Sequence, residues 1–233
     1  MRNRKYAVLL PIIGIAQFGL IPQAGAWGWL LAWSGLAWLL MGIAYATGRA
    51  QILGKRPDGT ISPLSIVILL PFLVFAWAMW RLNTRAGNSI AYNEIRPGLW
   101  LGRRPDANDL PEGVTLIVDL TTEFAAPRGV LKGRQYLCVP ALDASIPEAG
   151  DFIAAVEQIC RHDGGTLVHC ALGRGRSATV VAGVLIAKGV ATNAEDAERI
   201  MKSARPEVGL NAVQQRFLKA QIERLKSMRP VST

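Results

Sequence analysis

The sequence predicts an α/β domain of three layers, in which helices flank a central sheet, preceded by an α-helical membrane region. Two observations predict this architecture. Residues 6–48 contain no charged side chain, a run of 43 residues. From about residue 93 onward, short apolar runs alternate between strand-like and helix-like patterns, which favours an α/β layered fold. We therefore divide the 233-residue chain into a membrane region, residues 1–85, and a folded domain, residues 86–233.

The net charge of +9 belongs mostly to the membrane region. Residues 1–85 contain one acidic residue, Asp58, against eight basic ones, whereas the rest of the chain is nearly neutral. A nucleic-acid-binding protein carries its basic residues as a stripe on a folded face, so we expect no nucleic-acid partner. The three cysteines lack the number and spacing of a disulfide framework, and no cluster has metal-ligand spacing. The sequence therefore predicts no metal site and no cofactor.

The uncharged run holds two membrane-spanning helices, expected near residues 6–22 and 26–46. A bilayer crossing takes about 20 mostly apolar residues, and Pro22, Gln23 and Gly25 supply the turn between the two spans. Basic residues flank both outer ends of the pair, namely Arg2, Arg4 and Lys5 before it and Arg49, Lys55 and Arg56 after it. Because basic residues favour the inner side of a membrane, both ends of the pair are expected in the cytoplasm.

The N-terminus also resembles a cleavable signal peptide. A basic start is followed by an apolar stretch over residues 6–20, and Ala24, Gly25 and Ala26 resemble a small-residue cleavage site. Another apolar run follows at once, so cleavage would still leave a membrane protein.

A third apolar run, near residues 61–80, either crosses the membrane or forms a bent, re-entrant segment. Its length fits a crossing, and Trp77 and Trp80 suit a membrane interface. Pro71 removes a helical hydrogen bond in the middle of the run, and the basic Arg81 follows it. Three crossings from a cytoplasmic N-terminus would place the folded domain outside, so the sequence leaves the side of the membrane open.

The elements of the folded domain follow from its apolar periodicity. Strands are expected at Leu99–Leu101, Val114–Leu120, Tyr136–Val139 and Thr166–Cys170, and helices at Ala149–Arg161, Ser177–Lys188 and about Asn211–Lys226. One more helix is expected to begin at Thr192, because Thr192 and Glu195 have the spacing of a capping box.

Residues 169–177, His-Cys-Ala-Leu-Gly-Arg-Gly-Arg-Ser, connect the last strand to the helix that follows. The backbone N–H groups of such a tight loop can point inward to bind an anion, and the positive end of the helix dipole faces the same point. Glycines let the backbone approach an oxyanion closely, and Arg176 offers a planar, two-pronged donor suited to phosphate. We therefore expect a phosphate site at Ala171, Leu172, Gly173, Arg174 and Gly175.

The same positive field favours the thiolate of Cys170 over its thiol. Cys170 is therefore predicted to be a nucleophile placed beneath a bound phosphorus atom. His169 is expected to order the loop through hydrogen bonds, and Ser177 to donate a hydrogen bond to the sulfur and help it leave in a second step. Cys138 and Cys160 are interpreted as small apolar residues of the core.

The pattern H-C-x-x-G-x-x-R-S resembles the signature of cysteine-dependent protein tyrosine and dual-specificity phosphatases. The resemblance covers about residues 93–225 and implies that residues 86–233 form a dual-specificity phosphatase catalytic domain. It also implies a cysteinyl-phosphate intermediate and an aspartic acid, upstream of the cysteine, that protonates the leaving oxygen. Asp143, 27 residues before Cys170, is the candidate general acid. Asp151 is the rival, although acids are favoured in the first turn of a helix for structural reasons.

The resemblance leaves the substrate open. We expect a multi-pass bacterial inner-membrane enzyme that acts on phosphotyrosine, phosphoserine or phosphothreonine in proteins. The spacing that begins Asn93-x-Ile-x-Pro-Gly-Leu-Trp-Leu-Gly, with Asp143 and G-R-x-R-S, also resembles the phosphatidylglycerophosphate phosphatase branch, and lipid attachment suits a phospholipid substrate. Against this, Ala171 stands where phosphoinositide phosphatases usually have lysine.

Two other classes of function remain as alternatives. An inactive phosphate-binding module on a membrane anchor would not require the intact set of Cys170, Arg176 and Asp143. A sulfur-transfer or arsenate-reducing enzyme could use a similar cysteine loop, but arsenate reduction normally needs further resolving cysteines. Three charged residues outside the loop are expected at the surface, although each could approach the loop: Arg103, Arg104 and Glu123.

Overall fold

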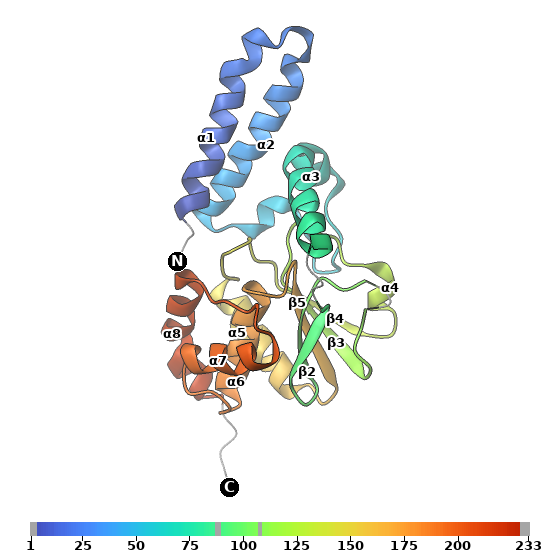
Figure 1. The fold of residues 1–233 in the computed structure, drawn as a ribbon, viewed down its shortest axis with the longest axis vertical. Coiled ribbons are helices and arrows are strands. Elements are labelled where there is room, and N and C mark those ends of the chain that lie inside the picture. The colour runs from blue at the N-terminus through green and yellow to red at the C-terminus, as the bar shows by residue number, and fades with distance from the viewer. Residues whose placement is uncertain (1–3, 87–89, 107–108, 229–233) are drawn as a thin grey trace. The chain divides into compact units, whose positions relative to one another are not determined.

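The computed structural model describes residues 4–86, 90–106 and 109–228, so Arg2 of the basic flank lies outside the described residues. The chain forms two compact units (Figure 1). The first unit comprises Met1–Asn88 and Thr122–Ala125, and the second comprises Ser89–Thr121 and Ala126–Thr233. The predicted α/β fold with a sheet flanked by helices is confirmed, and a helical region precedes it.

Helices make up most of the first unit. Helices α1 (Arg4–Leu20) and α2 (Gly28–Thr47) form a hairpin, and two short 3-10 turns, η1 (Ile21–Gln23) and η2 (Gly25–Trp27), connect them. After a further 3-10 turn, η3 (Ala50–Leu53), the third apolar run forms one continuous helix, α3 (Pro63–Ala86). By length and composition, all three helices could cross a membrane.

Small residues allow the two helices of the hairpin to pack closely. A Cβ atom added to Gly42 on α2 would lie 2.3 Å from Cγ of Pro11 on α1. One added to Gly14 would lie 2.7 Å from the carbonyl oxygen of Gly35. Close backbone approach through small residues is the usual packing mode of helices in lipid, where helix association has no hydrophobic driving force.

Pro71 does not interrupt α3, because another helix supplies the hydrogen bond that it removes. Proline has no N–H, so the carbonyl oxygen of Val67, four residues earlier, loses its donor within the helix. The indole N–H of Trp33 on α2 donates to this oxygen at a distance of 3.0 Å. In an apolar environment, such a replacement bond is what makes a proline within a helix tolerable.

Four residues from later in the chain belong to the same unit. The indole N–H of Trp77 donates to the carbonyl oxygen of Glu123 at 2.7 Å, and the ring of Trp80 lies 5.3 Å from that of Phe124. The expectation that Glu123 lies at the surface is wrong, because the residue is only 7% exposed. Its carboxylate accepts hydrogen bonds from the backbone N–H and the hydroxyl of Thr122, which compensates its burial.

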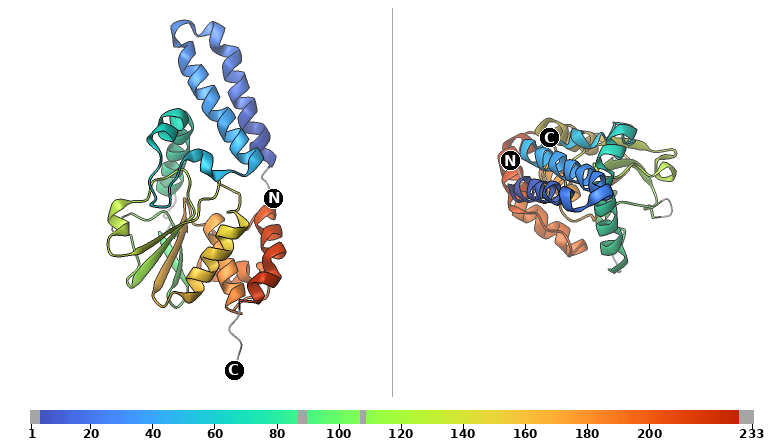
Figure 2. Two further views of the ribbon diagram at one scale, coloured as in Figure 1. Left: turned by 180° about the vertical axis from the view of Figure 1, so that it is seen from behind. Right: turned by 90° about the horizontal axis from the view of Figure 1, so that it is seen from above.

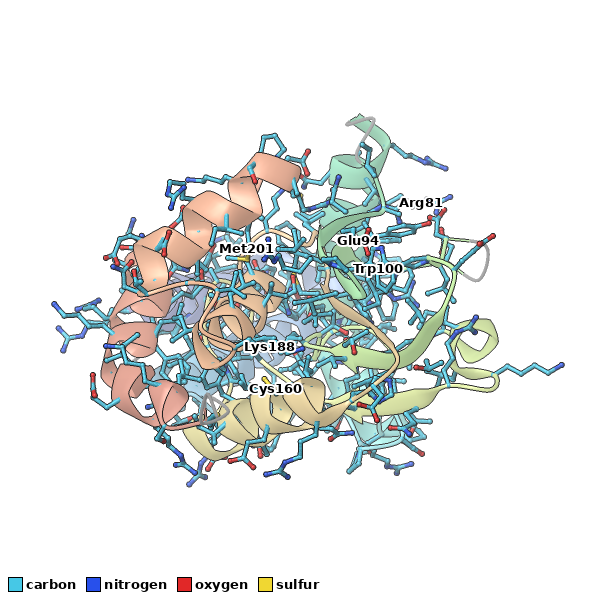
Figure 3. The ribbon with its side chains drawn as sticks, turned by 90° about the horizontal axis from the view of Figure 1, so that it is seen from below. Arg81, Glu94, Trp100, Cys160, Lys188 and Met201 are labelled. Carbon is cyan, nitrogen blue, oxygen red and sulfur yellow. The ribbon has the colours of Figure 1, made fainter. Side chains whose placement is uncertain are left out.

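The second unit is built on a five-stranded mixed sheet with the order β1-β2-β5-β3-β4. Its strands are β1 (Tyr92–Arg96), β2 (Leu99–Arg103), β3 (Val114–Asp119), β4 (Gln135–Cys138) and β5 (Gly165–Cys170). Strands β2, β5, β3 and β4 run parallel, and β1 pairs antiparallel with β2, with Glu94 opposite Trp100 (Figure 3). The sequence interpretation missed β1.

Helices α5 (Ala149–Arg161), α6 (Arg176–Ala187), α7 (Ala194–Ala204) and α8 (Ala212–Lys226) cover one face of this sheet (Figures 1 and 2). Every residue of α6 is buried, as expected for a helix with apolar side chains on all sides. The main core joins Val118 and Val168 of the sheet to Phe152 of α5. A short helix, α4 (Arg128–Leu131), and a smaller apolar cluster lie on the other face.

The predicted capping box at Thr192 is wrong, although the predicted helix is present as α7. Asn193 is the N-cap residue of α7, and its side chain accepts from the backbone N–H of Asp196 at 2.8 Å. Thr192 instead donates to the carboxylate of Asp196. Asparagine is at least as good an N-cap as threonine, so the helix starts one residue later than predicted.

Candidate active site

Cys170 ends β5, the central strand of the sheet, and is 3% exposed. Residues 171–175 follow it, and α6 begins at Arg176. In open sheets with parallel strands, binding sites form beyond the carboxyl ends of the strands. The predicted phosphate loop therefore lies where this fold class places its ligands.

The carbonyl groups of this loop are held from outside. They accept hydrogen bonds as follows: Ala171 from the Arg104 backbone N–H at 3.2 Å, Leu172 from Arg205 Nη2 at 3.1 Å, Gly173 from Arg205 Nε at 2.9 Å, and Arg174 from the Gly209 backbone N–H at 3.0 Å. In a trans peptide, the C=O and the next N–H point in opposite directions. The N–H groups of residues 172–175 therefore face away from these partners, as an anion-binding loop requires.

The sulfur of Cys170 lies at the base of this loop. The backbone N–H of Gly173 and the hydroxyl of Ser177 each donate to Cys170 Sγ at 3.3 Å. Two hydrogen-bond donors thus converge on one sulfur, close to the N-terminus of α6.

Gly173 is the one loop position where the backbone itself requires glycine. Its φ angle is +70°, and a Cβ atom there would lie 2.4 Å from the carbonyl carbon of Gly102 on β2. The loop therefore rests directly on the end of the neighbouring strand.

Arg176 joins the loop to the segment that carries the candidate acid. Its side chain is 2% exposed, and it donates to the carbonyl oxygen of Ala141 through Nη1 at 3.0 Å. Its Nη2 lies 3.1 Å from Oδ1 of Asp143, whose side chain is 67% exposed. The structure thus brings Asp143 to the loop, whereas Asp151 lies exposed in the first turn of α5.

The arginines around the loop are more buried than the sequence suggested. Arg103 ends β2 and forms an ion pair with Asp109 at 2.9 Å, and Arg104 is also partly buried. Burial lowers the pKa of Arg104, and the negative charge of Asp119 opposes this shift. The expectation of a solvated loop at these two residues is therefore wrong. Arg174 is more exposed and lies 3.6 Å from Glu207.

His169 is buried directly before the nucleophile candidate. Its Nδ1 lies 3.9 Å from Oδ1 of Asp119, at the end of the adjacent strand β3. The imidazole of His169 therefore lies beside the carboxyl end of β3.

The other two cysteines are partly buried. Cys160, on α5, lies beside Lys188 (Figure 3). Burial raises the pKa of the Cys160 thiol, and the charge of Lys188 opposes this only in part. A thiol with a raised pKa is a poor nucleophile at neutral pH, which fits a structural role.

Arg205 is the site residue that sequence reasoning missed. It follows α7, 35 residues after Cys170, and its side chain is 2% exposed. Besides the two loop carbonyls, it donates to the Ile90 carbonyl at 3.0 Å and to Oδ1 of Asn93 at 2.8 Å. Only its position in the folded chain reveals this role, because no local pattern marks an arginine that binds backbone carbonyls.

Comparisons with known proteins agree with this geometry. Residues 99–223 match the catalytic domain of dual specificity phosphatases. Dual specificity protein phosphatase 22 of Xenopus tropicalis is 37% identical over 98 residues, which are 38% of this chain and 45% of that protein. The human protein of the same name is 29% identical over 143 residues, 58% of this chain and 77% of that protein. The chain spans about half the length of the first of these relatives.

Solved structures show the same fold. PTPMT1 superposes with a TM-score of 0.53 at 24% identity, over 58% of this chain and 96% of that one. PTPMT1 in complex with PI(5)P gives a TM-score of 0.53 at 23% identity, over 59% of this chain and 97% of that one. At these identities the likeness shows the fold alone, whereas the family match covers more than half of the sequence. The chain therefore belongs to the family of dual specificity phosphatase catalytic domains.

Proposed function

We propose that this chain is a membrane-anchored phosphoric monoester hydrolase that works through a cysteinyl-phosphate intermediate. The observation that carries the proposal is the loop at residues 171–175: the carbonyls of residues 171–174 are held from outside the loop, while Cys170 Sγ lies at its base. A phosphate dianion bound by the inward N–H groups would place its phosphorus above the sulfur. No residue of this mechanism requires a metal.

In the first step the thiolate of Cys170 attacks phosphorus, and the bond to the leaving oxygen breaks. Arg176 binds two equatorial oxygens of the phosphoryl group and stabilises the charge that develops on them. Asp143 donates its proton to the leaving oxygen. Arg176 contacts the Asp143 side chain in the structure, and a bound phosphate would take that place on the guanidinium.

In the second step water attacks the cysteinyl phosphate, and Asp143, now ionised, accepts the proton of that water. The electron pair of the S–P bond returns to sulfur, and the hydroxyl of Ser177 stabilises the departing thiolate through its hydrogen bond. Inorganic phosphate leaves, and the enzyme regains its starting state.

Asp143→Asn is expected to lower kcat by about 10²–10⁴-fold on alkyl phosphates, because no proton is then available for the leaving oxygen. On p-nitrophenyl phosphate the loss should be smaller, since that leaving group departs without protonation. Asp151→Asn is the matched control and should retain the wild-type rate. Equal losses of kcat on both substrates, or a loss in Asp151→Asn instead, would show that Asp143 is not the general acid.

We propose phosphorylated protein as the substrate class, with phosphotyrosine, phosphoserine and phosphothreonine all accepted. A phospholipid, of the phosphatidylglycerophosphate kind, is the second candidate. Three helices of membrane-spanning length would bring lipid headgroups to an anchored enzyme, and the related fold of PTPMT1 has been solved with PI(5)P. We place the chain in a membrane as a multi-pass protein, with the bacterial inner membrane as the proposed location.

The test compares phosphate release from three substrates by the full-length protein in detergent and in liposomes. These substrates are a phosphotyrosine peptide, a phosphothreonine peptide and phosphatidylglycerophosphate, with Cys170→Ser as the blank. We expect release from both peptides above the blank. A large preference for the lipid would replace the first substrate class with the second. Binding of phosphate without release from any substrate would instead identify an inactive phosphate-binding module.

A further inference from the structure

The candidate acid Asp143 lies in a tight turn, residues 142–145, which we call the acid turn. The backbone N–H of Ser145 donates to the carbonyl oxygen of Leu142 at 3.1 Å, so Asp143 and Ala144 are the central residues of this turn. Ala144 has a φ angle of +52° and is the only non-glycine residue in the described part of the chain with a positive φ. A residue with a Cβ atom keeps this costly conformation only where the surrounding structure holds it. The acid turn therefore needs contacts from outside.

Two side-chain amides at the start of α8 supply such contacts. Nδ2 of Asn211, the N-cap residue of the helix, donates to the carbonyl oxygen of Ala144 at 2.9 Å. Nε2 of Gln214 donates to the carbonyl oxygen of Ser145 at 3.1 Å. Gln214 and Ser145 are both buried, where an unpaired carbonyl is unfavourable. The two amides thus hold consecutive carbonyls, one and two residues after Asp143.

The helix cap fixes the orientation of both amides. Oδ1 of Asn211 accepts from the backbone N–H groups of Val213 and Gln214 at 2.9 and 3.1 Å. Oε1 of Gln214 accepts from the backbone N–H of Asn211 at 3.0 Å, which completes a capping box. Because backbone N–H groups only donate, each amide must turn its oxygen toward the helix backbone. Each NH₂ group is then left to donate to the acid turn.

Gln214 also lies against the phosphate loop. A Cβ atom added to Gly175, the last loop residue before α6, would lie 3.1 Å from Nε2 and 3.3 Å from Oε1 of Gln214. The acid turn is held from the loop as well, because Arg176 contacts Asp143. A bound phosphate would take that place on the guanidinium, whereas the contacts from α8 use no atom of Arg176. The amides of α8 therefore still hold the acid turn when phosphate is bound.

We propose that Asn211 and Gln214 are positioning residues for the general acid. Their amides fix the acid turn beside the phosphate loop, so the carboxyl group of Asp143 stays within reach of the leaving oxygen after it has lost its contact with Arg176. Neither side chain acts on the reacting atoms, and both act through Asp143. The inference rests on the proposed role of Asp143 as general acid.

The test uses variants that separate the helix cap from the contact with the acid turn. Asn211→Asp and Asn211→Ser each keep an oxygen that can cap α8, but neither keeps the amide that donates to the Ala144 carbonyl. Serine adds no charge, so a loss shared by both variants is not an effect of the new carboxylate. Gln214→Met removes the second amide and keeps the length of the side chain. Asn193→Asp, at the exposed N-cap of α7, is the matched control.

For the full-length protein, kcat/KM is measured with an alkyl phosphate and with p-nitrophenyl phosphate, together with the inhibition constant of inorganic phosphate. This ratio reports the steps up to the cysteinyl phosphate, in which Asp143 acts only as an acid. Each variant at residues 211 and 214 should lower kcat/KM on the alkyl phosphate by about 10²-fold, the loss typical of a small misplacement in a site. The values for p-nitrophenyl phosphate, whose leaving group needs no proton, and for phosphate inhibition should stay near the wild type. The control Asn193→Asp should keep all three values.

Asp143→Asn provides the reference for these losses. In that background Asn211→Ser should cause no further loss on the alkyl phosphate, because the group that it positions is absent. A further loss there, or a loss in the single variants that is the same for both substrates, would overturn the positioning role. If Asp143→Asn lowers kcat/KM and the Asn211 variants do not, only the positioning role is overturned. If Asp143→Asn itself has no effect, the acid assignment is overturned and the positioning role with it.

Discussion

Cys170→Ser is expected to abolish turnover while phosphate binding persists. Removal of a catalytic nucleophile lowers kcat on the order of 10⁶-fold in enzymes of covalent mechanism. Serine keeps nearly the shape of cysteine, but its hydroxyl does not ionise near neutral pH, so the attacking anion is lost. The loop N–H groups and Arg176 are unaffected, and they supply the binding energy for phosphate.

The measurement pairs phosphate release with calorimetric binding of a phosphate analogue such as tungstate. Cys160→Ser is the matched control, because Cys160 is half-buried on α5 beside Lys188 and has no part in the proposed chemistry. The control should turn over like the wild type. A near-normal rate in Cys170→Ser would refute the cysteinyl-phosphate mechanism. Loss of analogue binding in that variant would show that the sulfur itself holds the anion.

The local part of the site could be predicted from the sequence. Residues 169–177 are contiguous, and the chemistry of a strand, a tight loop and a helix N-terminus is determined by neighbours along the chain. The structure places the Ser177 hydroxyl against the sulfur of Cys170, and it adds two contacts that the sequence did not suggest, from the Gly173 N–H to the same sulfur and from Asp143 to Arg176. Gly173 and Ser177 are only three and seven residues from Cys170 in the sequence, so their contacts with its sulfur are local.

The support around the site could not be predicted in the same way. Arg205 binds loop carbonyls from a turn far along the sequence, and the backbone N–H of Arg104 binds another loop carbonyl from the end of a neighbouring strand. An arginine pattern in a sequence does not show which acid will face it. Arg103 was therefore expected in solvent, whereas Asp109 compensates its charge and lets it be partly buried.

Errors in the fold have similar causes. The segment Tyr92–Arg96 has only one buried residue, Ile95, so an edge strand there lacks the apolar alternation by which strands are recognised. Pro71 made the third apolar run ambiguous in the sequence. The hydrogen bond that satisfies the Val67 carbonyl comes from Trp33, which lies on another helix and cannot be inferred from the local sequence. Tertiary contacts resolve what local propensity leaves open.

Arg176→Lys is the second substitution with a large expected effect. The guanidinium of Arg176 is almost fully buried and already uses two nitrogens, one on the Ala141 carbonyl and one on Asp143. Lysine keeps the positive charge but cannot make two parallel hydrogen bonds to a phosphoryl group. We expect kcat to fall on the order of 10³-fold or more, as when a charge-stabilising donor is removed from a transition state. Arg161→Lys, at an exposed ion pair on α5, should leave kcat unchanged.

The division of this loss between kcat and KM identifies what Arg176 does. If the arginine stabilises the transition state, kcat and kcat/KM should fall together, whereas a rise in KM alone would indicate ground-state binding only. Because Arg176 contacts Asp143, the effects of Arg176→Lys and Asp143→Asn should combine less than additively in the double variant. Strict additivity would mean that the contact between the two side chains plays no part in the reaction. The contact between Arg176 and Asp143 would then be a feature of the ligand-free site only, and other residues would position Asp143 during the reaction.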